Sequence, residues 1–197
     1  MVIRSMNIHS IQQQDSRLKL SYQDYILFPS DGKRHEIVDG EHHMAPSPEI
    51  RHQEISRNLA LIIASYLREN KLGKLLYAPC DVVLSNWDIV VPDLIFIAKE
   101  NEKIVTKKNI RGVPDLVVEI ISPASKRYDL VMKRKLYERF GVKEYWIFDP
   151  EKERVEVYTL SESDRRFLEP KIYEHDQVME SSLFPALKIN LTEVFSG

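Results

Sequence analysis

Two acidic residues interrupt strongly apolar stretches of the chain: Asp93 in IVVPDLIFIAK and Glu119 in PDLVVEIIS. A carboxylate buried there without a partner costs several kcal/mol, so each acid needs a compensating group. If both stretches are strands, side chains two residues apart share a face, and the two acids converge where the strands are neighbours. Converging carboxylates repel unless a cation neutralises them, and a hard divalent ion prefers oxygen ligands. The pair therefore predicts a Mg²⁺ site, with Mn²⁺ as the substitute.

Each acid also has an ordinary structural interpretation. Asp93 could be a strand-edge residue after Pro92, and Glu119 could reach water from the end of a sheet. Asp115 directly follows Pro114 and is more typical of a strand start than of a site, although it could border one.

A lysine in the segment 127–140 gives an independent indication of a site. On a helical wheel at about 100° per residue, Lys133 falls within the arc of the apolar residues, which are Leu130, Leu136, Tyr137 and Phe140. Lys135 projects to the opposite side and is predicted to be solvated. The inward lysine could extend its stem to water. The functional alternative is that its ammonium meets the carboxylates on the sheet.

Hydrophobic periodicity predicts the elements that position these residues. We expect a short helix at 21–27, a hairpin turning at Asp39-Gly40, an amphipathic helix at 49–70 and a helix at 127–140. Between the two long helices lie three apolar runs that are typical of strands, LLYAPCDVVLS, IVVPDLIFIAK and PDLVVEIIS. The runs EYWIFDP and RVEVYTL predict two more strands. The order helix, three strands, helix, strand favours a layered α/β sheet with both faces covered.

Length and composition set the outer bounds. With 197 residues, 43% of them hydrophobic, residues 21–197 are expected to form a single domain after a disordered segment 1–20. No apolar stretch is long enough to span a bilayer, which predicts a cytoplasmic protein without a membrane partner. Cys80 is the only cysteine, which excludes an intrachain disulfide and a cysteine-rich zinc site. The tail 161–197 shows no chemistry.

The net charge of −2 argues against a protein that coats nucleic acid through bulk electrostatics. The segment 126–143 is nevertheless distinctly basic. It could face phosphates, or it could simply be a solvated surface.

Taken together, these stretches resemble the Uma-type restriction endonuclease family within the PD-(D/E)XK nuclease superfamily. The resemblance covers roughly 21–150 and is expected to extend into the tail. It rests on HEIVDGE, SPEIRHQEI, VVPDLIFI, PDLVVEIISPAS and YDLVMKRKLYERFGVKEYWIFDP. It implies an α/β fold with a restriction-endonuclease-like core, to which an N-terminal hairpin and C-terminal strands are added.

The resemblance also assigns site residues. The superfamily aspartate falls on Asp93, its central acid on Glu119, and the role of its first-helix glutamate on Glu36 of HEIVDGE. One departure is that Ile121 stands where the Glu-X-Lys motif would have its lysine. Lys133 then looks like a migrated replacement that reaches the same space from the following helix.

The implied activity is metal-dependent hydrolysis of phosphodiester bonds in nucleic acid, with DNA preferred. The expected catalytic residues are Glu36, Asp93, Glu119 and Lys133, with the metal on Asp93 and Glu119. The backbone carbonyl of Ile120 could assist as a ligand. His52 and Tyr137 could border the site, although a lone histidine is more often structural.

A homodimer is expected from the resemblance. The main alternative is a catalytically inactive nucleic-acid-binding or interaction module of the same fold. A third is a structural dimerisation protein.

Overall fold

The computed structural model describes residues 19–45, 47–122 and 125–197. All but the last two residues of the segment 1–20, predicted to be disordered, therefore lie outside the described residues. In the described part of the chain, no helix combines the length and apolar character needed to cross a membrane.

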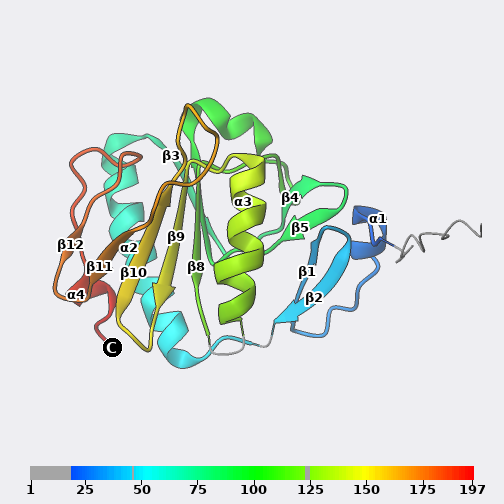
Figure 1. Cartoon of the computed structure of the whole chain (residues 1–197), viewed down its shortest axis with the longest axis horizontal. Coiled ribbons are helices and arrows are strands. Elements are labelled where there is room, and N and C mark those ends of the chain that lie inside the picture. Colours follow the sequence, from blue (N-terminus) through cyan, green and yellow to red (C-terminus); the bar gives the residue numbers. More distant parts are fainter. Residues whose placement is uncertain (1–18, 46, 123–124) are drawn as a thin grey trace, which may run out of the picture.

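Within the described residues, six strands form the central sheet in the order β11-β10-β9-β8-β6-β3 (Figure 1). Neighbouring strands are antiparallel except β8 and β9, which are parallel. The bounds are β3 (Gly73–Tyr77), β6 (Leu94–Ala98), β8 (Leu116–Ile120), β9 (Glu144–Asp149), β10 (Arg154–Thr159) and β11 (Lys171–Glu174).

A long helix covers each face of this sheet (Figure 1). Helix α2 (Ile50–Asn70) packs with Phe96 and Val118, whereas α3 (Arg134–Phe140) packs with Ile95 and Val117 on the other face. Alternate residues of β6 and β8 thus point to opposite helices, as the period of two requires. The chain order α2, β3, β6, β8, α3, β9 confirms the predicted order and the α/β fold.

Two predicted strands were wrong, because each of these apolar runs forms two strands that are separated by a proline. The first run forms β3 and then β4 (Val82–Ser85), separated by Pro79, and the second forms β5 (Asp88–Val90) and then β6, separated by Pro92. Proline donates no hydrogen bond to a ladder, so the chain can leave one sheet there and enter another. Asp93 consequently lies at the crossing between two sheets.

The second sheet has the order β2-β1-β5-β4-β7 among the described residues. The hairpin turns at Asp39-Gly40 as predicted, with positive φ at both residues, which suits the right-handed twist of its strands. Helix α1 (Tyr22–Tyr25) packs beside it, and a 3-10 helix, η1 (Lys99–Ile104), precedes β7. The remaining strands of this sheet are β1 (Arg34–Val38), β2 (Glu41–Ala45) and β7 (Ile110–Arg111).

The predicted helix at 127–140 is not uniformly α-helical. Its first part is a π-helical segment, η2 (Tyr128–Lys133), which continues into α3 and ends at Gly141 in the left-handed region. The π turns widen the helix locally, and such segments are frequent at functional sites.

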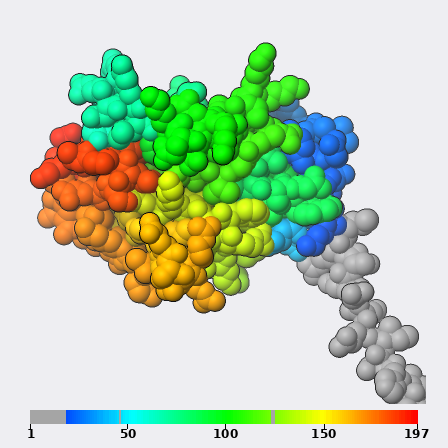
Figure 2. Space-filling model, turned by 90° about the horizontal axis from the view of Figure 1, so that it is seen from above, coloured from blue at the N-terminus to red at the C-terminus, as the bar shows by residue number. Residues whose placement is uncertain are grey.

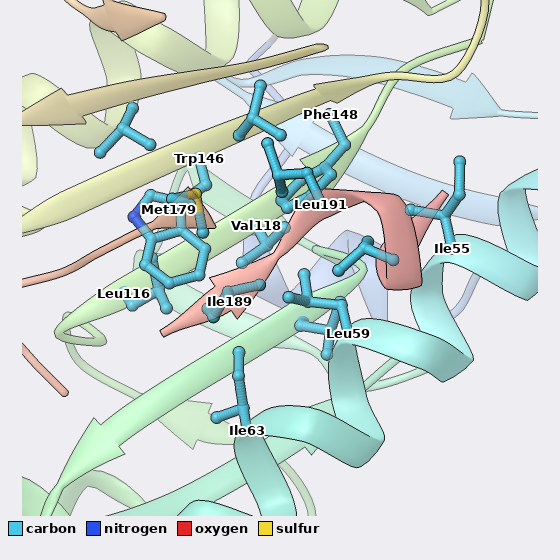
Figure 3. Close-up of a cluster of buried hydrophobic side chains, with 14 of the residues drawn as sticks. Ile55, Leu59, Ile63, Leu116, Val118, Trp146, Phe148, Met179, Ile189 and Leu191 are labelled. Atoms are coloured by element: carbon cyan, nitrogen blue, oxygen red, sulfur yellow. The ribbon is translucent and has the colours of Figure 1, made fainter. Parts of the chain in front are cut away.

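The tail contributes to the core next to α2 (Figure 3). Its apolar side chains pack around Trp146 and Leu59, and they are Met179, Phe184, Ile189, Leu191, Val194 and Phe195. The elements of the tail are β12 (Val178–Met179), β13 (Ile189–Asn190) and α4 (Leu191–Val194). Figure 2 shows the red C-terminal segment and the blue N-terminal part at opposite ends of the molecule.

Candidate active site

A pocket of about 190 Å³ lies where β2 leads to α2 and β8 leads to η2. Its lining combines acids with basic groups. The charged or titratable residues in that lining are Arg34, Glu36, Glu49, His52, Asp93, Glu119, Tyr128, Asp129 and Lys133.

Lys133 is enclosed by carboxylates. Its Nζ lies 2.9 Å from Glu36 Oε1, 2.9 Å from Glu119 Oε1 and 3.5 Å from Asp129 Oδ1. Burial lowers the pKa of Lys133, but the carboxylates outweigh that effect and raise the pKa well above its ordinary value. The side chain therefore remains an ammonium. Side chains from three elements, β1, β8 and η2, therefore meet at the ammonium of Lys133.

Glu119 receives a second donor on the same oxygen. The hydroxyl of Tyr137 donates to Glu119 Oε1 at 2.9 Å, and both side chains are buried. Burial raises the pKa of Glu119 well above its usual range despite the ammonium of Lys133, and burial also raises the pKa of Asp129. Both acids therefore favour their protonated form, and a further cation would favour the ionised form.

Asp93 is held from both sides. Its Oδ1 accepts from Arg34 at 2.5 Å, while its Oδ2 accepts from the backbone N–H of Ile120 at 2.8 Å and lies 3.0 Å from His52 Nε2. Burial raises the pKa of Asp93, but His52, Arg34 and the Ile120 N–H together hold it below its ordinary value. Asp93 therefore stays ionised although it is almost fully buried.

The structure brings the four residues expected to be catalytic, Glu36, Asp93, Glu119 and Lys133, to this one pocket. His52 lines it beside Asp93. Tyr137 contacts Glu119, as described above.

Asp115 does not line the pocket, so the possibility that it borders the site was wrong. It lies just before β8 begins, whereas Glu119 lies near the end of that strand. Its carboxylate accepts from the backbone N–H of Ala98 at 2.7 Å and pairs with Lys143 Nζ at 2.7 Å. The alternative, a strand-start residue, describes its structural role.

Sequence reasoning missed Arg34, Tyr128 and Asp129. Arg34 stands two residues before Glu36 on one strand, so the period of two could have placed both on the same face. Asp129 stands four residues before Lys133, a spacing typical of helical ion pairs. Tyr128 gave no such signal. Its hydroxyl is buried and makes no hydrogen bond within the described structure.

The donor set suits a hard divalent cation in its chemistry. The buried acids that line the pocket, Glu36, Asp93, Glu119 and Asp129, face the permanent cations of Arg34 and Lys133. If all ionise, two negative charges remain, and carboxylate oxygens are the ligands that Mg²⁺ prefers. As the described side chains stand, no group of three or more His, Cys, Asp or Glu residues is arranged to hold a metal ion. A cation would therefore have to displace a protein partner of these acids.

Comparisons with known proteins identify the family and the fold. A family model named Uma2 and described as "Putative restriction endonuclease" matches residues 22–192. A crystal structure from Anabaena variabilis, titled as that of "a putative nuclease belonging to DUF820", has a TM-score of 0.74 and 18% identity. The similarity covers 89% of this chain and 97% of that one, and at this identity it shows a shared fold. No curated protein matches the chain.

Proposed function

The chain belongs to the Uma2 family of putative restriction endonucleases, and we propose that it is a metal-dependent endonuclease that hydrolyses phosphodiester bonds in DNA. The observation that carries the proposal is the contact of 2.9 Å between Lys133 Nζ and Glu119 Oε1. Ile121, which occupies the position of the lysine in Glu-X-Lys, is buried in the apolar cluster beneath α3. The ammonium thus reaches the central acid from another element.

The residues have separable roles in this proposal. Asp93 and Glu119 would hold one Mg²⁺ or Mn²⁺, and Glu36 and the carbonyl of Ile120 would assist them. Such an ion, when bound, lowers the pKa of a water molecule and polarises a phosphate oxygen. Lys133 orients the attacking water or offsets the charge that develops at phosphorus.

Two side chains and one backbone N–H keep the acids in place. His52 and the Ile120 N–H fix Asp93 through its Oδ2, and Tyr137 fixes Glu119 through its Oε1. His52 and Tyr137 are positioning residues, because they act through the carboxylates.

A homodimer would bring two such pockets to one duplex, one for each strand. Light scattering on the protein with and without a duplex tests this part of the proposal, and a monomer in both samples contradicts it.

The decisive experiment is Mn²⁺ calorimetry combined with cleavage of plasmid DNA, single-stranded DNA and RNA. The variants are Asp93→Ala, Lys133→Met and the matched control Lys135→Met, whose lysine is exposed on the same helix. We expect Asp93→Ala to lose Mn²⁺ binding and cleavage, and Lys133→Met to bind Mn²⁺ but cleave at least about 100-fold more slowly. Lys135→Met should match the wild type in both measurements.

One observation favours the alternative, a catalytically inactive nucleic-acid-binding module. Asp93 is already neutralised by Arg34 and Glu119 by Lys133, so the fold can keep these acids without a metal. A wild-type protein that binds DNA but neither binds Mn²⁺ nor cleaves any substrate would establish this alternative. Cleavage that persists in Lys133→Met would contradict the role given to Lys133.

A further inference from the structure

The two permanent cations of the pocket are held very differently. Lys133 touches three carboxylates, and its side chain is only 5% exposed. Arg34 forms its ion pair with Asp93, and its side chain is 21% exposed. Arg34 also projects from the first residue of β1, at the rim of the second sheet. Of the two, Arg34 is therefore the cation that can leave its partner at the lower cost.

The carboxylate of Asp93 is divided between two kinds of partner. Its Oδ2 faces His52 and the Ile120 N–H, which are fixed by α2 and β8. Its Oδ1 faces Arg34. If Arg34 leaves, Asp93 keeps its orientation through Oδ2 and presents Oδ1 to the pocket. The oxygen that would bind a cation is thus the one that Arg34 covers.

We propose that Arg34 is a phosphate-binding residue, held by Asp93 in the metal-free protein and released to the nucleic acid backbone when a divalent cation binds at Asp93. The inference rests on the proposed function. Like charges repel, so Arg34 and a cation compete for Oδ1. A guanidinium can form two parallel hydrogen bonds to a phosphate, which suits Arg34 to its second partner. Binding of the metal and binding of the substrate are coupled through this side chain.

The test uses the full-length wild type, Arg34→Ala, Arg34→Lys and the control Arg51→Ala. Arg51 pairs with Glu153 and does not line the pocket. Calorimetry gives the affinities for Mn²⁺ and Ca²⁺. Fluorescence anisotropy gives the affinity for a labelled DNA duplex, once in EDTA and once in Ca²⁺, a hard cation that also takes oxygen ligands. Thermal melting checks that each variant folds.

We expect Arg34→Ala to bind both metal ions about tenfold more tightly, because the competitor for Oδ1 is gone. Its affinity for DNA should fall about tenfold in Ca²⁺ and clearly less in EDTA, where Arg34 of the wild type is engaged by Asp93. In its DNA affinity in Ca²⁺, Arg34→Lys should fall between the wild type and Arg34→Ala, since lysine keeps the charge but lacks the planar fork. Arg51→Ala should resemble the wild type in its metal affinities.

Two results would overturn the inference alone. Metal affinity in Arg34→Ala that equals or falls below that of the wild type excludes competition at Oδ1. A loss of DNA affinity that is the same in EDTA and Ca²⁺, or no loss at all, excludes the coupled release. In both cases the wild type can still bind Mn²⁺ and cleave DNA, so the proposed function stands. A wild type that does neither removes both proposals together.

Discussion

The hydroxyl of Tyr137 and the ammonium of Lys133 both reach Glu119 Oε1, each at 2.9 Å. Burial raises the pKa of the Tyr137 phenol well above its ordinary value, so the residue remains a donor at any working pH. Glu119 thereby keeps one oxygen engaged by the protein. This arrangement limits the rotation of its carboxylate and leaves Oε2 as the atom that can take a further ligand.

Replacing Tyr137 by Phe removes this donor and keeps the ring in the core. We expect a loss of about 1–2 kcal/mol in the free energy of unfolding, because a buried hydrogen bond to Glu119 is lost without a replacement. Cleavage should decrease mainly in kcat, because the hydroxyl is buried and acts through Glu119. Urea unfolding and steady-state kinetics measure the two effects. Tyr77→Phe, at a side chain that is 68% exposed, is the control. Unchanged stability and kcat in Tyr137→Phe would contradict the role of this hydrogen bond.

At the residue scale, the sequence revealed a charge only where its surroundings were apolar. Glu119 stands in a run of buried aliphatic residues, and Lys133 falls on the packed side of its helix, so both were conspicuous. Arg34 stands within GKRHE, where a charged residue attracts no notice. Its importance appears only when β1 is placed beside the crossing at Asp93.

At the element scale, the register of β3 against β6 fixes the strand that carries Asp93 into the core. Gly73 pairs with Ala98, and its φ is +154°. A Cβ on Gly73 would lie 2.1 Å from the carbonyl oxygen of Ile97, far inside the van der Waals distance. The glycine is therefore needed for the close approach of the two backbones as well as for its backbone conformation.

The substitution Gly73→Ala should separate these two requirements when it is compared with Gly32→Ala. Gly32 also has a positive φ, but a Cβ there meets nothing within 4 Å. We expect Gly32→Ala to cost about 1 kcal/mol from the backbone conformation alone. Because of the clash, Gly73→Ala should lose about 1–3 kcal/mol more in the free energy of unfolding than Gly32→Ala. Urea unfolding of both variants measures the difference, and equal losses would show that the clash is relieved by a cheap shift.

The pattern of apolar residues predicted the elements of the core because periodicity reports which faces are buried. It did not reveal that one apolar run serves two sheets, because every residue of β5 and β6 is buried and the apolar run continues on both sides of Pro92. Nor did it reveal the π turns of η2. Periodicity at about 100° per residue assumes a regular helix, and the placement of Lys133 agreed because α3, which follows it, is regular.

At the scale of the whole molecule, the site depends on how two sheets meet. Glu119 lies on β8 of the central sheet and Asp93 directly precedes β6, whereas Arg34 and Glu36 arrive on β1 of the second sheet. Such a meeting of distant segments carries no local signal in the sequence. The same holds for the tail, whose short apolar stretches complete the core on the α2 face although they showed no pattern that predicted it.

Arg139 links α3, which covers the central sheet, to the second sheet. Its guanidinium pairs with Asp39 at the hairpin turn, at 2.6 Å, and with Asp88 of β5, at 2.9 Å. The side chain is 48% exposed, so we expect Arg139→Ala to cost less than about 1 kcal/mol in global stability. The effect should instead be local. Loss of the link loosens the hairpin and thereby the positions of Arg34 and Glu36.

Hydrogen exchange of backbone amides tests this expectation. In Arg139→Ala, amides of β1 and β2 should exchange about three- to tenfold faster, while those of β8 and β9 keep their protection, because local opening draws on the elements with the fewest buried contacts. Lys135→Ala, on the same helix, is the control. Cleavage should weaken in parallel with the hairpin, since Glu36 is carried by β1. Faster exchange spread evenly over both sheets would mean that they open as one unit, and the pocket would then be as rigid as the central sheet itself.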